Sequence, residues 1–165
     1  MSPNRVSRVQ LLLVMVILLV LQFYVRPRLW DARISPDFLL IALMLFAMRS
    51  SPGVAALAGF VVGLIGDTLT PARFGAGALA HTLVGYLAAW GRAVFFADNM
   101  LVNAGFVAAG LWLRDLIVLL ASGIDSRQVV TELTLYSPLQ ALTTAGFALL
   151  VLVTFKAWFS VRLDA

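Results

Sequence analysis

The sequence predicts an all-α integral membrane protein, built as a single bundle of six transmembrane helices of which the second is short. Three observations lead to this fold class: 62% of the 165 residues are hydrophobic, only 12% are charged, and the mean hydropathy is +0.98. Soluble domains are roughly 45–50% apolar and about 25% charged. The composition therefore excludes most soluble enzymes and soluble nucleic-acid-binding domains.

Six stretches of the chain are apolar enough to be candidate membrane spans. A bilayer core of about 30 Å needs about 20 apolar residues in a helix. Within one domain over residues 1–165, the predicted spans cover residues 9–25, 36–48, 52–69, 76–91, 100–121 and 138–159. The second span has 13 residues, which is about 20 Å of helix, so it thins the bilayer, lies among tilted neighbours or is partly buried in protein.

The first span follows Arg5 and Arg8, as the apolar part of a signal peptide would. No small-x-small cleavage motif comes after it, so we interpret it as an uncleaved signal-anchor helix. The starts of three later spans share one signal, a serine that caps the helix before a proline at its first position. These pairs are Ser35-Pro36, Ser51-Pro52 and Ser137-Pro138.

The remaining boundaries carry other signals. Gly75 and Gly77 break the chain before the fourth span, and Asp98-Asn99 supplies a cap for the fifth. Asp125 and Gln128 resemble a capping box, which predicts a short interfacial helix from Ser126 to Leu135 before the sixth span begins.

The charge distribution indicates a lipid partner rather than a nucleic acid. The net charge is +4, but the basic residues are scattered between apolar runs and form no basic patch. Basic loops of an apolar chain anchor to anionic lipid head groups. Six spans place both termini on one side with six basic residues against five on the other, and Arg5 and Arg8 favour cytoplasmic termini.

The residues that enzymes and metal sites need are missing from the sequence. There is no cysteine and only one histidine, His81, so we predict no metal and no cofactor. We expect His81 to be a packed, hydrogen-bonded imidazole. The sequence has no nucleophile elbow, phosphate loop or dinucleotide fingerprint, and no two carboxylates share a helix face. We therefore predict that the protein is not an enzyme.

The third span carries a strip of small residues at steps of four. Ala55, Gly59, Gly63 and Asp67 lie on one helix face, and the two glycines form a GxxxG pair that lets another helix approach closely. We favour packing inside the bundle over the alternative, a homodimer through this face. Asp67 is expected to bond the backbone of the loop that follows it.

Polar side chains inside the fifth and sixth spans form a second candidate site. Arg114 and Asp115 lie well inside an apolar run, and intramembrane charges mark a site or pair across helices. The expected carboxylate partners of Arg114 are Asp67 and Asp115. An internal network that holds the helices in register and a functional site remain equal interpretations of this predicted polar site, which comprises Asn103, Arg114, Asp115, Gln140 and Thr144.

Four sequence motifs follow one another along the middle of the chain. They are Pro36 to Leu40 at the second span, Gly59 to Asp67 in the third, Leu83 to Leu87 in the fourth and Leu113 to Leu116 in the fifth. This order, over roughly residues 9–160, resembles the rod shape-determining protein family MreD. The helix-packing or partner interface is accordingly predicted at Gly59, Gly63, Asp67, Gly75, Gly85 and Tyr86.

The resemblance implies a function as well as a fold. It implies a non-enzymatic scaffold of the bacterial inner membrane, in the cell-elongation machinery that builds lateral peptidoglycan. Its implied partner is MreC, and through it RodA with its transpeptidase and, indirectly, MreB. The family's fold resembles the S components of energy-coupling-factor transporters, so the alternative is a small-molecule-binding subunit of a vitamin transporter.

Overall fold

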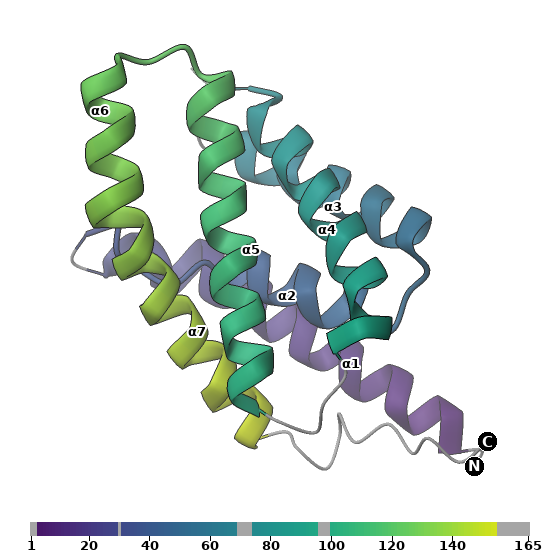
Figure 1. The fold of residues 1–165 in the computed structure, drawn as a ribbon. Coiled ribbons are helices and arrows are strands. Elements are labelled where there is room, and N and C mark those ends of the chain that lie inside the picture. The colour runs from purple at the N-terminus through teal and green to yellow at the C-terminus, as the bar shows by residue number, and fades with distance from the viewer. Residues whose placement is uncertain (1–2, 30, 69–73, 96–99, 155–165) are drawn as a thin grey trace.

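The computed structural model describes residues 3–29, 31–68, 74–95 and 100–154, and every regular element in these ranges is a helix. The all-α class predicted from composition is confirmed. Figure 1 shows the elements, which are α1 (Pro3–Val20), the π turn η1 (Leu21–Val25), the 3-10 turn η2 (Arg26–Arg28), α2 (Phe38–Ala47), α3 (Pro52–Asp67), α4 (Ala76–Phe95), α5 (Met100–Ala121), α6 (Ser126–Thr131), the π turn η4 (Glu132–Tyr136) and α7 (Ser137–Thr154).

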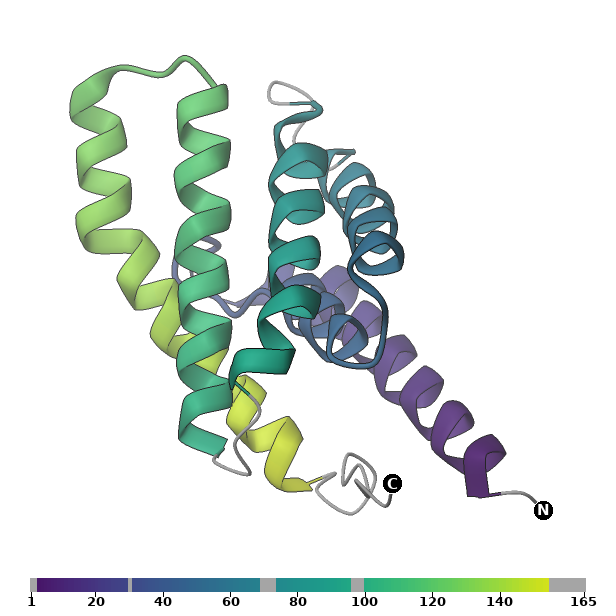
Figure 2. The same ribbon diagram turned by 45° about the vertical axis from the view of Figure 1, so that its right-hand side comes forward.

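A helix occupies each of the six predicted stretches, up to residue 154 in the last of them. Among the residues that the structure describes, three helical runs are long and apolar enough to cross a membrane, namely Val9–Arg28, Leu101–Ala121 and Ser126–Thr154. Figures 1 and 2 show α3, α4, α5 and the α6–α7 run side by side and alternating in direction. In the view of Figure 1, α1 and α2 cross behind them. The first turn of α1 and the last turn of α7 lie toward the same end of the molecule.

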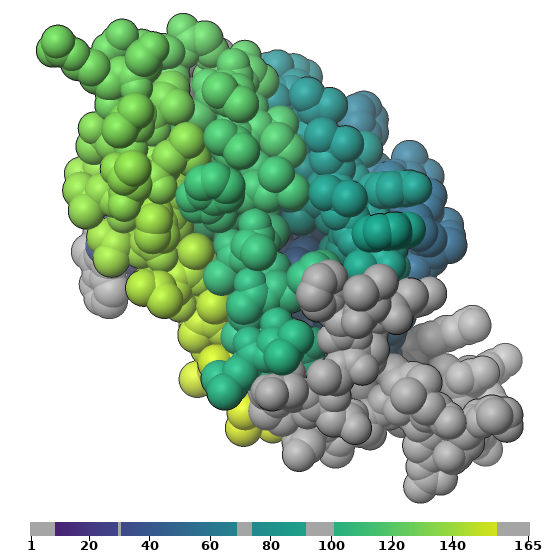
Figure 3. All heavy atoms as spheres, in the orientation of Figure 1, coloured from purple at the N-terminus to yellow at the C-terminus, as the bar shows by residue number. Residues whose placement is uncertain are grey.

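Helix α2 is the centre of the bundle. Nine of its ten residues are buried, which explains why this stretch is short yet apolar on every side. Its Phe38 packs edge to face on Phe147 of α7, with ring centroids 4.9 Å apart. In the space-filling view, α2 lies behind α4, α5 and α7 and is largely hidden from this side (Figure 3). Among the options for a short second span, burial in protein is the one that the fold adopts.

The helix of the sixth predicted span does not begin at Ser137-Pro138, because the short helix predicted before it is joined to it instead of standing separate. Residues 126–154 form one continuous helical run. The π turn η4 ends just before the proline, and the Ser137 N–H donates to the Glu132 carbonyl five residues back. A proline lacks an N–H and clashes with the carbonyl four residues earlier, so a wider turn lets the helix continue.

Two other predicted caps also differ from the structure. Helix α2 begins after Asp37, which caps it, rather than after Ser35. The hydroxyl of Ser35 instead donates to the Asp31 carbonyl at 2.6 Å. Helix α3 does start at Pro52, but no side-chain bond caps it, and the same holds for Asp125 before α6. Asp98-Asn99 lies outside the described residues.

Candidate functional site: a buried polar cluster around Asp37 and Arg114

A non-helical segment, residues 31–37, enters the bundle just before α2. Its end is deeply buried, with Ser35 1% and Asp37 4% exposed, so its backbone groups need partners inside the protein. Helix α7 supplies two of them. The Gln140 amide donates to the Ser35 carbonyl at 3.1 Å, and the Thr144 hydroxyl accepts from the Asp37 N–H at 3.1 Å.

Two further side chains bond the backbone of this segment and of the first residue of α2. The Thr143 hydroxyl donates to the Ile34 carbonyl at 2.7 Å, and the Gln22 amide oxygen in η1 accepts from the Phe38 N–H at 3.1 Å. Gln22 is 4% exposed, although in the sequence it only interrupts an apolar run. Buried backbone therefore determines where these polar residues are needed.

The Asp37 carboxylate joins the helix cap to the intramembrane arginine. One oxygen accepts from the Leu40 N–H at 3.0 Å, and the other lies 2.7 Å from Arg114 Nη2. The second terminal nitrogen of Arg114 lies 3.1 Å from Asp115 Oδ1. The side chains of Asp37, Arg114 and Asp115 are 6%, 15% and 12% exposed. A buried arginine thus bridges two carboxylates from different parts of the chain.

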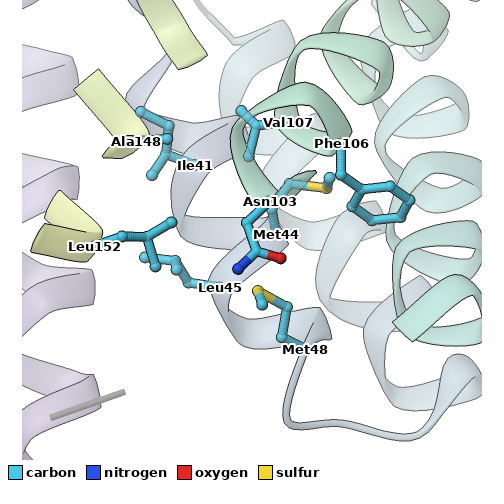
Figure 4. A pocket seen from close by; sticks show the side chains of 9 residues that line it. All are labelled: Ile41, Met44, Leu45, Met48, Asn103, Phe106, Val107, Ala148 and Leu152. Atoms are coloured by element: carbon cyan, nitrogen blue, oxygen red, sulfur yellow. The ribbon is translucent and has the colours of Figure 1, made fainter. Parts of the chain in front are cut away.

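The structure brings together most of the predicted polar site and separates one member. Arg114, Gln140 and Thr144 bond residues 35–37 directly, and Asp115 joins the cluster through its ion pair with Arg114. Asn103 lies apart, on a cavity of about 20 Å³ lined mainly by apolar side chains of α2, α5 and α7 (Figure 4).

Of the two carboxylates expected to pair with Arg114, Asp115 does so and Asp67 does not. The sequence reasoning missed Asp37 as the main partner. The signal available for it was its position, an acidic residue directly before an all-apolar helix, which is a typical N-cap.

Asp67 caps α4 from outside that helix. Its carboxylate accepts three backbone N–H bonds, from Gly75 at 2.8 Å and from Gly77 and Ala78 at 3.0 Å each. The first N–H groups of a helix have no partner within it, and an anion there is favourable. The predicted bond to the loop backbone is thus present at Gly75, and it extends into the first turn of α4.

The small-residue strip of the third span faces α4 within the same chain. Ala55, Gly59, Gly63 and Asp67 are the buried residues of α3. A Cβ on Gly59 would lie 2.1 Å from the His81 carbonyl oxygen, and one on Gly63 would lie 2.4 Å from the Ala78 Cα.

The glycines predicted around α4 have different roles. A Cβ on Gly85 would lie 2.5 Å from the Ala55 carbonyl oxygen, which extends the α3–α4 contact by another turn. Gly75 has a φ of +95°, a conformation that glycine adopts without strain. Tyr86 is 45% exposed on the outer surface.

His81 is buried between these helices, as expected for a packed imidazole. Its Nδ1 lies 2.8 Å from the Gly77 carbonyl, whereas Nε2 has no hydrogen-bond partner within the described residues. No group of three or more histidine, cysteine or acidic residues in the described part of the chain could hold a metal ion. The polar cluster around Asp37 and Arg114 consists of ion pairs and of hydrogen bonds to backbone groups. These interactions join α2, α5, α7 and η1.

These features define a class of protein, a polytopic helical membrane protein whose central helix is anchored by buried polar contacts. The sequence profile of the family described as rod shape-determining protein MreD matches residues 4–160. The chain therefore belongs to the MreD family, whose members determine rod cell shape. No curated protein and no solved structure gave a significant match.

Proposed function

We propose that this protein is a non-enzymatic inner-membrane scaffold of the cell-elongation machinery, which binds MreC and helps to coordinate lateral peptidoglycan synthesis. The family match over residues 4–160 is the observation that carries this proposal. The partners proposed beyond MreC are RodA with its transpeptidase and, indirectly, MreB. Within the same proposal, Gly59, Gly63 and Gly85 hold the bundle in the shape that a partner recognises.

The polar cluster supports a scaffold better than a vitamin-binding subunit. Gln140 and Thr144 bond the backbone of residues 35–37, and Arg114 bonds two carboxylates, so these groups are already occupied. The cavity beside Asn103 has about 20 Å³, whereas small-molecule pockets enclose roughly 300–1,000 Å³. The groups expected to converge on a vitamin are thus used to hold the fold together.

A complementation experiment tests the scaffold function. We expect this chain, expressed in rod-shaped bacteria depleted of their own MreD together with its cognate MreC, to restore rod shape and to co-purify MreC in mild detergent. A tagged membrane protein of similar size from another family serves as the control for both readouts. Rod shape restored without any MreC in the purified complex would contradict the proposed partner.

We further propose that both termini are cytoplasmic. The basic residues Arg5 and Arg8 support this orientation, and the ends of the described helical region lie toward the same end of the molecule. A reporter fused after Ala165 is expected to be active only if it is of the cytoplasmic type. Activity of a periplasm-specific reporter at that position would overturn the proposal, because either the orientation or the even number of spans would then be wrong.

A further inference from the structure

An open polar groove lies between the segment 31–35 and the first part of the α6–α7 run. It has a volume of about 450 Å³ and lies apart from the buried cluster around Asp37. Its walls carry side chains of both charges together with neutral hydrogen-bonding groups. The lining residues are Arg33, Ile124, Arg127, Gln128, Thr131, Glu132 and Tyr136.

The charge of Arg33, one of the lining residues, is compensated within the protein. Two guanidinium nitrogens of Arg33 bond the Asp31 carboxylate at 3.0 and 3.3 Å, and the guanidinium carbon lies 4.0 Å from the centre of the Tyr136 ring. The side-chain hydrogen bond from Arg33 lowers the pKa of Asp31, so this carboxylate remains ionised. Arg33 is thus held in place, and its charge is matched by that of Asp31.

The rest of the lining offers one positive and one negative group. Arg127 and Glu132 both lie on the α6–η4 surface that lines the groove. Within the described part of the chain, no ion pair joins either of them to another side chain. A ligand that carries an anion and a cation a few ångströms apart would satisfy both groups, whereas a simple anion would be repelled by Glu132.

One face of the α6–α7 run changes from polar at the groove to apolar farther along the helix. Arg127, Thr131, Leu135, Leu139 and Leu142 follow one another at steps of four and three residues, so they lie along one side of the run. The three leucines are 51%, 43% and 69% exposed. A molecule seated here would therefore meet charged groups at one end and an exposed apolar strip at the other.

We propose that this groove binds the zwitterionic head group of a membrane phospholipid, of the phosphoethanolamine type. The phosphate binds Arg127, the ammonium group binds Glu132, and an acyl chain follows Leu135, Leu139 and Leu142. The Arg33–Asp31 ion pair adds no net charge, which favours a neutral head group over an anionic one.

Native mass spectrometry of the delipidated protein with defined lipids tests the proposal. We expect the wild type to retain phosphatidylethanolamine at least tenfold better than phosphatidylglycerol. Arg127→Gln is expected to reduce the binding of both lipids, because each carries a phosphate. Glu132→Gln is expected to remove the preference between them, because only the ethanolamine lipid carries an ammonium group.

Two controls establish whether the lipid binds in this groove and whether its acyl chains contribute. Arg28→Gln removes another exposed arginine, one that does not line the groove, and is expected to leave the tenfold preference unchanged. Soluble glycerophosphoethanolamine, which lacks acyl chains, is expected not to displace the lipid at equal concentration; displacement would overturn the lipid assignment. If the wild type retained both lipids equally, and Arg127→Gln retained as much of each lipid as the wild type did, the site itself would be overturned.

Discussion

Gly63→Leu is expected to prevent the bundle from assembling. In the wild-type structure, even a single Cβ at this position would lie 2.4 Å from both the Ala78 Cα and the Gly77 carbonyl oxygen. These are backbone atoms of α4, so no side-chain rotation relieves the overlap and the two helices must separate. Overpacking a well-packed core commonly costs about 1–3 kcal/mol, and contact with backbone places this substitution at or above the upper end of that range.

Three measurements test Gly63→Leu: the amount of membrane-inserted protein, its thermal unfolding in detergent and its co-purification with MreC, the proposed partner. We expect all three to fall together. The matched control is Gly105→Leu in α5, because a Cβ there would meet nothing within 4 Å and the position is exposed. If Gly63→Leu accumulates like the control and still co-purifies MreC, close packing of α3 on α4 is not what this glycine provides.

Arg114→Ala is the second substitution with a large expected effect. Removal of the Arg114 guanidinium leaves Asp37, which is 4% exposed, without its cationic partner. Asp115 also loses its ion pair. Breaking a buried ion pair by deleting one member costs about 3–5 kcal/mol, since an uncompensated charge remains inside. We expect protein level and thermal stability in detergent to decrease together, as a structural role requires.

A second variant distinguishes the structural role of Arg114 from a role in partner binding. Adding Asp37→Asn to Arg114→Ala removes the main stranded charge while keeping a side chain that caps α2, so we expect stability to recover in part. Arg28→Ala, at an exposed arginine, serves as the control. A folded Arg114→Ala protein in cells that lose rod shape would instead indicate a partner site, and normal stability with normal shape would contradict both roles.

Much of the helical arrangement follows from local patterns in the sequence. The spacing of Ala55, Gly59, Gly63 and Asp67 predicts one face of a helix, and these four are the residues that α3 buries. The helix α5 occupies the predicted range, Met100–Ala121. Periodicity and composition are properties of short stretches of sequence, so they can be recognised without knowing what packs against each helix.

The partners of the polar residues were decided by the tertiary structure. Asp37, Asp67 and Asp115 are equivalent anions in the sequence, yet Asp67 caps α4 whereas Arg114 takes the carboxylate 77 residues away.

The remaining departures have the same origin in three dimensions. Gln22 is needed because a non-helical segment passes beside it, and Pro138 stays inside a helix because a π turn widens the chain before it. The sequence alone determined which faces of the helices are apolar or small. Which polar groups meet depends on how those faces pack, because buried donors, acceptors and charges must be satisfied by whatever the packing brings within bonding distance.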